Sequence, residues 1–225
     1  MSDVLARVEA GLRSAFGEPD ARAAVTFLGT DRIEVLRFPV PRAGDTAPGS
    51  GDAAPGSGDA APGSGDAAPG SGDAVRYVTL GMSAHPMADP TSPLADPVRG
   101  PRAELLLTVR PGRADTDKVL RPLAVLAASP QVEGLVVAPG ASLDTGEPLW
   151  PGASFTAVLV GEPGGLVEDL ALDAPMDPVR FLPLLPMTPN EAAWKRVHGA
   201  AALQERWLRH GTDLRDPLRK GVPLD

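Results

Sequence analysis

The chain has 225 residues, a net charge of −8 at pH 7 and no cysteine. The absence of cysteine excludes a disulfide framework and a thiolate metal site, and it fits a reducing compartment. The acidic balance argues against nucleic-acid binding, which needs a basic stripe on the surface. We find neither a signal-peptide core nor an apolar run long enough to cross a bilayer, so we expect a cytoplasmic protein without membrane contact.

The first predicted element is a helix over residues 4–16. Apolar side chains recur there at helical spacing, and the Gly17-Glu18-Pro19 segment ends the pattern. Two strand candidates follow, at residues 33–40 and 77–82. These two strands are expected to pair as a hairpin.

Between the two strand candidates lies a low-complexity repeat, residues 46–73, in which TAPGSGD is followed by three copies of AAPGSGD. Glycine, serine and alanine cannot bury enough surface to offset the entropy lost on ordering, so we predict a disordered, acidic insertion in a loop. Slippage expansion of a short loop is our preferred interpretation of the repeat. A functional spacer or a multivalent ligand is the alternative.

The middle of the chain is predicted to alternate between strands and one helix. Residues 103–109 indicate a largely buried strand, because apolar side chains occupy both of its faces. A helix is predicted over residues 115–129, and it must begin late or accommodate Pro122 in its first turn. The other predictions are an irregular segment at 82–102, strands at 135–138 and 155–160, and a possible short strand at 166–172.

Residues 179–211 are predicted to form a buried strand that runs into one long amphipathic helix. Thr188 is the expected N-cap, Pro189 suits the first helical position, and Glu191 completes a capping box. The helix should end at Gly211. Its predicted apolar stripe consists of Trp194, Val197, Ala201 and Leu208 with Trp207 beside it, and its predicted surface pairs are Glu191/Lys195 and Glu205/Arg209.

Together these elements predict an α+β fold with a mixed, mostly antiparallel sheet packed with N-terminal, middle and C-terminal helices. We expect residues 1–225 to form a single domain that ends in a C-terminal tail, residues 212–225. The chain without its repeat is long enough for one core.

One short motif suggests catalysis. The sequence Gly81-Met82-Ser83-Ala84-His85 follows a strand candidate and partly resembles the nucleophile elbow of hydrolases. That motif needs a helix directly after the serine, and three prolines forbid it here: Pro86, Pro90 and Pro93. We prefer a strand end that opens into a loop, with a small hydrolase using Ser83 and His85 as the alternative.

Metal and phosphate sites are not predicted. The histidines at positions 85, 198 and 210 are too scattered for zinc, and His198 and His210 would stand about 18 Å apart on one helix. Residues 161–165 are rich in glycine but lack the lysine and helix of a phosphate-binding loop. We therefore expect no metal ion, no cofactor and no catalytic residue.

Four residues are our candidates for contact with a protein partner: Asp144, Glu147, Trp150 and His198. Asp144 and Glu147 lie in a turn rich in glycine and proline, where acidic residues commonly serve as turn formers. Trp150 stands between two prolines in a polar loop, and an exposed aromatic residue favours an interface, although we prefer core packing for it. The choice rests on expected exposure and aromatic content.

Several ordered segments resemble the suppressor of fused domain in its compact bacterial form. These are YVTLGMS at 77–83, RAELLLTV at 102–109, the helix at 117–128, LVVAPG at 135–140 and FLPLLPMTPNEAAWKRVHGAAALQERW at 181–207. The similarity covers roughly residues 25–211. It implies an α+β domain without enzymatic activity that works by binding a protein, as animal relatives do with a transcription factor and bacterial relatives with polymorphic toxins.

The sequence thus predicts a cytoplasmic, non-enzymatic protein-binding domain, and we favour an immunity protein that neutralises a polymorphic toxin in a bacterium. The acidic balance would suit a basic toxin domain, because complementary charge speeds association. A regulatory scaffold that binds a non-toxin partner is a further alternative.

Overall fold

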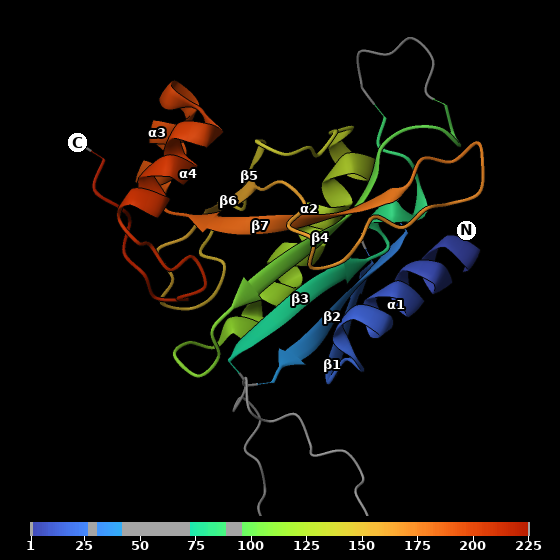
Figure 1. Cartoon of the computed structure of the whole chain (residues 1–225), viewed down its shortest axis with the longest axis horizontal. Coiled ribbons are helices and arrows are strands. Elements are labelled where there is room, and N and C mark those ends of the chain that lie inside the picture. The colour runs from blue at the N-terminus through green and yellow to red at the C-terminus, as the bar shows by residue number, and fades with distance from the viewer. Residues whose placement is uncertain (1, 27–30, 42–72, 89–95, 225) are drawn as a thin grey trace, which may run out of the picture.

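The computed structural model describes residues 2–26, 31–41, 73–88 and 96–224 (Figure 1). Seven strands form one sheet in the order β1-β2-β3-β4-β7-β6-β5. The strands are β1 (Ala21–Thr26), β2 (Arg32–Val40), β3 (Ala74–Leu80), β4 (Arg102–Val109), β5 (Ser142–Asp144), β6 (Ala157–Val160) and β7 (Val179–Met187). Every pairing is antiparallel except that of β4 with β7. The predicted α+β class with a mixed, mostly antiparallel sheet is confirmed.

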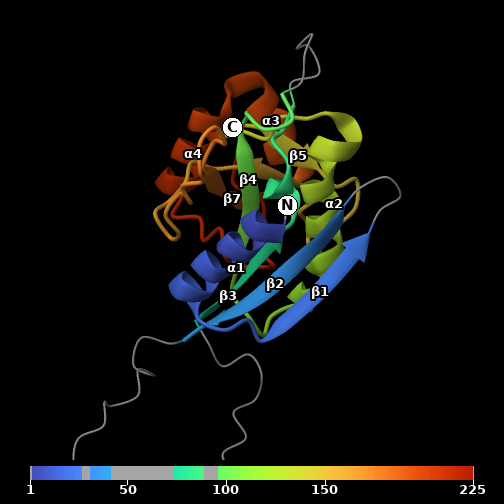
Figure 2. The ribbon, with the colours of Figure 1, turned by 90° about the vertical axis from the view of Figure 1, so that its right-hand side faces the viewer.

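Helices cover both faces of this sheet. They are α1 (Ser2–Phe16), α2 (Leu120–Glu133), α3 (Pro189–His198) and α4 (Ala200–Arg209), with short 3₁₀ turns η1 (Met82–Ala84) and η2 (Thr116–Val119). Figure 2 shows the sheet between α1 on one side and α2 on the other, with α4 on the α1 side. We call the α1 side the front face, and it is the face toward the viewer in Figure 1.

The apolar core accordingly has three parts. The largest lies beneath α2 and contains buried strand residues such as Leu105. A second, around Phe38, lies beneath α1, and a third, around Trp207, lies beneath α3 and α4. On the front face the second and third clusters are separate, which leaves the sheet between them uncovered by a helix.

The predicted hairpin of β2 and β3 is present, with Val40 opposite Ala74 at the end nearest the repeat. The repeat of residues 46–73 lies, apart from Asp73, outside the described residues. The predicted buried strand at 103–109 corresponds to β4.

Two strand predictions are wrong, and two strands escaped prediction. Residues 135–138 follow the left-handed Gly134 and form no strand, and residues 166–172 contribute only an isolated bridge from Leu170 to Val179. A short apolar run does not by itself reveal its conformation. The unpredicted strands, β1 and β5, are the two edges of the sheet, where a half-exposed strand leaves a weak hydrophobic pattern.

The predicted long helix is two helices that turn at Gly199. This glycine has φ 88° and ψ 166°, an arrangement that is accessible to glycine and that stops the α-helical path. The predicted apolar stripe is therefore broken: Val197 and Leu208 are 77% and 81% exposed, whereas Leu203 and Trp207 are buried. The predicted Glu205/Arg209 pair is present at 2.7 Å.

The last residues of the chain pack against the domain. Arg219 and Val222 are buried, and the backbone N–H of Arg110 donates to the carbonyl of Arg215 at 2.7 Å. Residues 212–225, predicted to be a tail, thus supply core contacts up to Leu224, which lies against the cluster beneath α3 and α4.

Candidate protein-binding site

The predicted partner contacts gather in part at one corner of the molecule, where the edge strand β5 meets α3. Asp144, the last residue of β5, lies 3.9 Å from Nη2 of Arg196 on α3, and both side chains are largely exposed. His198 ends α3 and is exposed as well. Glu147 is exposed in the turn that follows β5. We call Asp144, Glu147, Arg196 and His198, together with Trp194, the α3–β5 corner.

Aromatic and cationic groups are layered on α3 at this corner. The His198 ring stacks on Trp194 with ring centroids 4.1 Å apart, and the guanidinium of Arg206 lies 5.1 Å from the Trp194 ring. Trp194 is only partly buried. The corner therefore presents an aromatic ring beside arginines, and tryptophan and arginine are enriched in protein interfaces.

Asp144 also stabilises the turn that follows β5, as expected for an acidic residue in such a turn. Its Oδ1 accepts a hydrogen bond from the Gly146 N–H at 2.8 Å, which fixes the first turn after β5. The hydroxyl of Thr145 donates to the Glu147 carbonyl at 2.6 Å. These bonds hold both acidic residues on a defined loop, and the second carboxylate oxygen of Asp144 faces Arg196.

Trp150 does not belong to this surface. Its side chain is 1% exposed and packs edge-to-face on Phe155 with centroids 5.8 Å apart. Its indole N–H donates to the Pro217 carbonyl at 3.0 Å, so the polar end of the ring is satisfied by the last segment of the chain. The partner-contact prediction for Trp150 is therefore wrong, and the core interpretation is correct.

The start of α3 is fixed by the predicted capping box. The Thr188 hydroxyl accepts from the Glu191 N–H at 3.3 Å, and the Glu191 carboxylate accepts from the Thr188 N–H at 2.8 Å. Glu191 is fully buried, so it forms no surface pair with Lys195, and that prediction is wrong.

The buried Glu191 carboxylate instead holds the end of the chain. Both of its oxygens accept from Arg219, at 2.8 and 3.0 Å, and one accepts from the Trp207 indole N–H at 2.9 Å. Burial alone would raise the pKa of Glu191, but the hydrogen bonds from Arg219, Thr188 and Trp207 lower it below its usual value. We call these groups the Glu191–Arg219 knot. It joins α3, α4 and the C-terminal segment, and so positions the α3–β5 corner.

The serine and histidine of the hydrolase alternative are engaged with different carboxylates. Ser83 is fully buried, and its hydroxyl donates to Glu104 at 2.6 Å. His85 Nε2 pairs with Asp31 Oδ2 at 2.7 Å at a cavity of about 630 Å³ whose lining does not include Ser83. The arrangement lacks the exposed nucleophile held by a histidine base that nucleophilic catalysis requires.

Glu104 holds the loop that follows β3 through hydrogen bonds from that loop to its carboxylate. Its carboxylate accepts from the backbone N–H groups of Gly81 and Ser83 at 2.9 and 3.0 Å, and from the Thr79 hydroxyl at 2.6 Å. Burial raises the pKa of Glu104 in spite of these hydrogen bonds. The sequence motif around Ser83 is thus used to anchor η1, as the loop interpretation predicts.

Metal-ligating side chains do not cluster in the described part of the chain: no group of three or more His, Cys, Asp or Glu residues there could hold a metal ion. Of the helices in the described ranges, none has the length and apolar character that a bilayer crossing needs.

The family model of the suppressor of fused protein (SUFU) matches residues 62–220. The chain belongs to the SUFU family. The resemblance noted in the sequence is thereby confirmed, and the matched region includes the capping box of α3 and Arg219. A search of curated proteins finds no match to this chain.

Solved structures of SUFU proteins share the fold. A putative SUFU homologue from Neisseria gonorrhoeae FA 1090 is 18% identical with a TM-score of 0.65, and the match covers 100% of both chains. A structure of the Sufu–Fu complex is 13% identical with a TM-score of 0.56, covering 98% of this chain and 91% of that one. Drosophila Suppressor of Fused is 12% identical with a TM-score of 0.51; the match covers 97% of this chain and 50% of the Drosophila chain.

Proposed function

We propose that this SUFU-family chain is a non-enzymatic protein-binding domain and that it acts as an immunity protein against a basic toxin. The observation that carries the protein-binding role is the α3–β5 corner, where exposed charged groups surround the stacked Trp194 and His198 rings. Membership of a family with a structure of a Sufu–Fu complex supports a protein partner.

The toxin role is supported by charge. The net charge of −8 favours a basic partner, and Asp144 and Glu147 present carboxylates at the rim of the corner. Rim charges act mainly through long-range attraction, which raises the association rate and weakens with added salt. These two carboxylates would attract a basic nuclease or another cationic toxin domain.

A capture experiment tests the proposal. The tagged full chain is used to recover proteins from its own organism at low salt, and mass spectrometry identifies what is bound. We expect one stoichiometric partner with a basic domain. An excess of the chain should abolish the partner's toxicity. If the toxicity persists, the protein-binding role is supported and the immunity role is contradicted.

Charge reversal then maps the surface. The D144K/E147K variant should slow association with that partner by roughly tenfold at low salt, because it replaces attraction by repulsion. The matched control, E133K/E168K, makes the same change of net charge at two exposed acidic residues outside the corner. Equal slowing by both variants would show that net charge alone acts and that the corner is not the binding site.

The hydrolase alternative has a separate test. Ser83→Ala removes the hydroxyl that the hydrolase hypothesis requires as its nucleophile. We expect this variant to leave toxin neutralisation unchanged. Loss of a hydrolytic activity on Ser83→Ala, in a variant that still folds, would favour the enzyme.

A further inference from the structure

A groove of about 280 Å³ lies on the front face of the sheet, between the elements that cover its two ends. Its floor is formed by β3, β4 and β7, and Figure 1 shows these strands between α1 and the C-terminal helices. The lining is mainly apolar and includes Leu106, Pro183 and Leu185, with Leu166 and Leu214 from flanking segments. The groove therefore offers an apolar surface that neither α1 nor α4 covers.

Two polar side chains in this lining lack hydrogen-bond partners. Arg76 on β3 and Thr108 on β4 face each other as a cross-strand pair. Within the described residues, Nε of Arg76 and Oγ1 of Thr108 are both buried without any hydrogen-bond partner. Each such atom costs about 1–3 kcal/mol when it is left unsatisfied, and this cross-strand pair places two of them on neighbouring strands.

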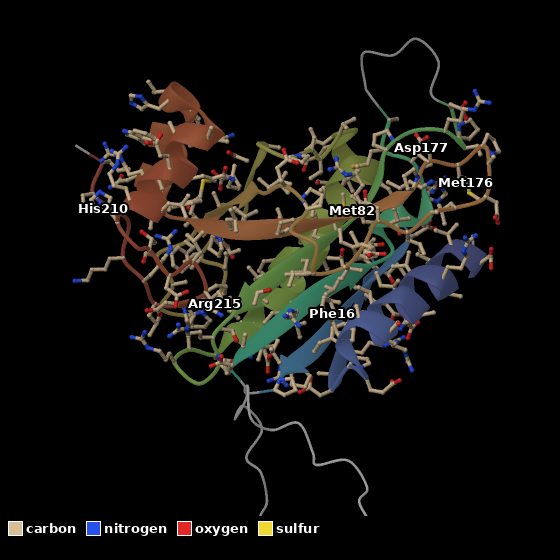
Figure 3. The ribbon with its side chains drawn as sticks, in the orientation of Figure 1. Phe16, Met82, Met176, Asp177, His210 and Arg215 are labelled. Atoms are coloured by element: carbon tan, nitrogen blue, oxygen red, sulfur yellow. The ribbon has the colours of Figure 1, made fainter. Side chains whose placement is uncertain are left out.

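The Arg76 guanidinium is held in place by an aromatic ring. It lies 4.6 Å from the ring centroid of Phe16, the last residue of α1. Figure 3 shows Phe16 and Arg215 on the viewer's side of the sheet, on opposite sides of β3 and β4. The cation is thus oriented before any ligand arrives, which lowers the entropy lost on binding.

The lining of the groove contains two arginines, Arg76 and Arg215, and no acidic residue, although the protein is acidic overall. Burial lowers the pKa of Arg76, and no described carboxylate opposes that shift. On the rim, Arg215 and Arg110 share one acid, Asp213, at 3.4 and 2.7 Å. The nearby acids Glu162 and Asp169 face Arg180, at 3.9 and 3.8 Å. A carboxylate is therefore the group that this surface lacks.

We propose that this surface, the Arg76 groove, binds a segment of a protein partner that presents a carboxylate beside an apolar side chain. The carboxylate would pair with the guanidinium of Arg76, and the apolar side chain would lie on Leu106, Pro183 and Leu185. The groove is at the small end of the range for ligand pockets, about 300–1,000 Å³, so it suits an anchoring side chain rather than a large cofactor. The inference is independent of the α3–β5 corner and of a toxin partner.

A peptide selection tests the groove directly. A library of displayed seven-residue peptides is selected in parallel on the wild-type chain, on Arg76→Met and on the control Arg121→Met. Methionine retains a flexible apolar side chain against Phe16 and removes the charge. Arg121 is an exposed arginine on α2.

We expect peptides with Asp or Glu next to Leu, Ile, Phe or Met to be enriched on the wild type and on Arg121→Met. A synthetic peptide of this kind should bind Arg76→Met at least tenfold more weakly, and its Asn or Gln analogue should bind the wild type equally weakly. These results would support the groove even if the capture experiment found no toxin.

Three results would overturn the inference: no enrichment, enriched peptides without acidic residues, or equal affinity for Arg76→Met. Thermal melting is measured on each variant, so that loss of binding is separated from loss of folding. Because Arg76→Met removes an unsatisfied buried donor, we expect it to melt no lower than the wild type.

Discussion

Two arginines on the front face differ in their partners, because Arg219 is buried against a carboxylate and the half-buried Arg76 meets none among the described residues. In the Glu191–Arg219 knot, the guanidinium meets both oxygens of a carboxylate at 2.8 and 3.0 Å and also donates to the Pro186 carbonyl at 2.6 Å. In the Arg76 groove, the guanidinium lies on a phenyl ring and has no acidic partner among the described residues. The two Nη groups of Arg219 are thus paired by the fold, whereas the Arg76 guanidinium meets no carboxylate among the described residues; Nε lacks a hydrogen bond in both arginines.

The difference separates a structural role from a binding role. A satisfied buried pair fixes geometry, and here it ties α3 to the end of the chain. An arginine without an acidic partner keeps its charge available for a ligand, and exceptions to polar saturation occur at functional sites. The effects of replacing Arg219 and Arg76 are compared below by the change that each replacement causes in the free energy of unfolding.

The largest effect is expected from Arg219→Met, which breaks the knot. It leaves the buried Glu191 carboxylate without its cation and should lower the free energy of unfolding by about 3–5 kcal/mol. Urea unfolding measures this loss, and Arg113→Met, which breaks the more exposed pair with Asp216, is the control. A loss below about 1 kcal/mol would show that the knot does not hold the C-terminal segment.

The contribution of the knot should depend on pH. The pKa of Glu191 in the folded protein is below its usual value of 4.5, so its ionised form stabilises the fold above about pH 4.5. As the pH falls toward the lowered folded value, this contribution is lost. The difference in unfolding free energy between wild type and Arg219→Met should therefore shrink below pH 4.5; a difference that stays constant down to pH 3 would contradict the assignment.

A smaller loss is expected from Thr188→Ala, which removes the side-chain half of the capping box at α3. N-cap replacements of this kind cost about 1 kcal/mol, and Thr188→Ser should restore most of it because the hydroxyl is kept. Equal unfolding midpoints for Thr188→Ala and wild type would mean that Glu191 alone fixes the start of the helix.

These residues also show what the sequence could reveal. The capping box was predictable because its partners are three residues apart, and β2, β3, β4 and β7 were predictable from dense apolar patterns. The pairing of Glu191 with Arg219 spans 28 residues and follows only from the folded chain, so the sequence indicated a surface pair with Lys195 instead.

The candidate site was predicted less well than the fold. Val197 and Leu208 match a helical stripe, yet the backbone of Gly199 turns the chain and leaves both exposed. Core packing was the preferred interpretation of Trp150, but that the last segment of the chain covers it does not follow from the sequence. Arg76 lies just before the predicted strand at 77–82, and its place in β3, away from acidic groups, becomes visible only when the sheet is assembled.

The measurement that tests the central contrast most directly is urea unfolding of Arg76→Met at neutral pH, beside wild type and Arg121→Met. Arg76→Met removes an unsatisfied buried donor, which stabilises the fold, and it also loses a cation–π contact worth about 0.5–1 kcal/mol. The net effect should be a rise of about 1 kcal/mol in the free energy of unfolding. Arg121→Met should leave it unchanged. A loss of about 1 kcal/mol or more in Arg76→Met alone would show that Arg76, like Arg219, serves the fold, and the account of an arginine held open for a partner would be wrong.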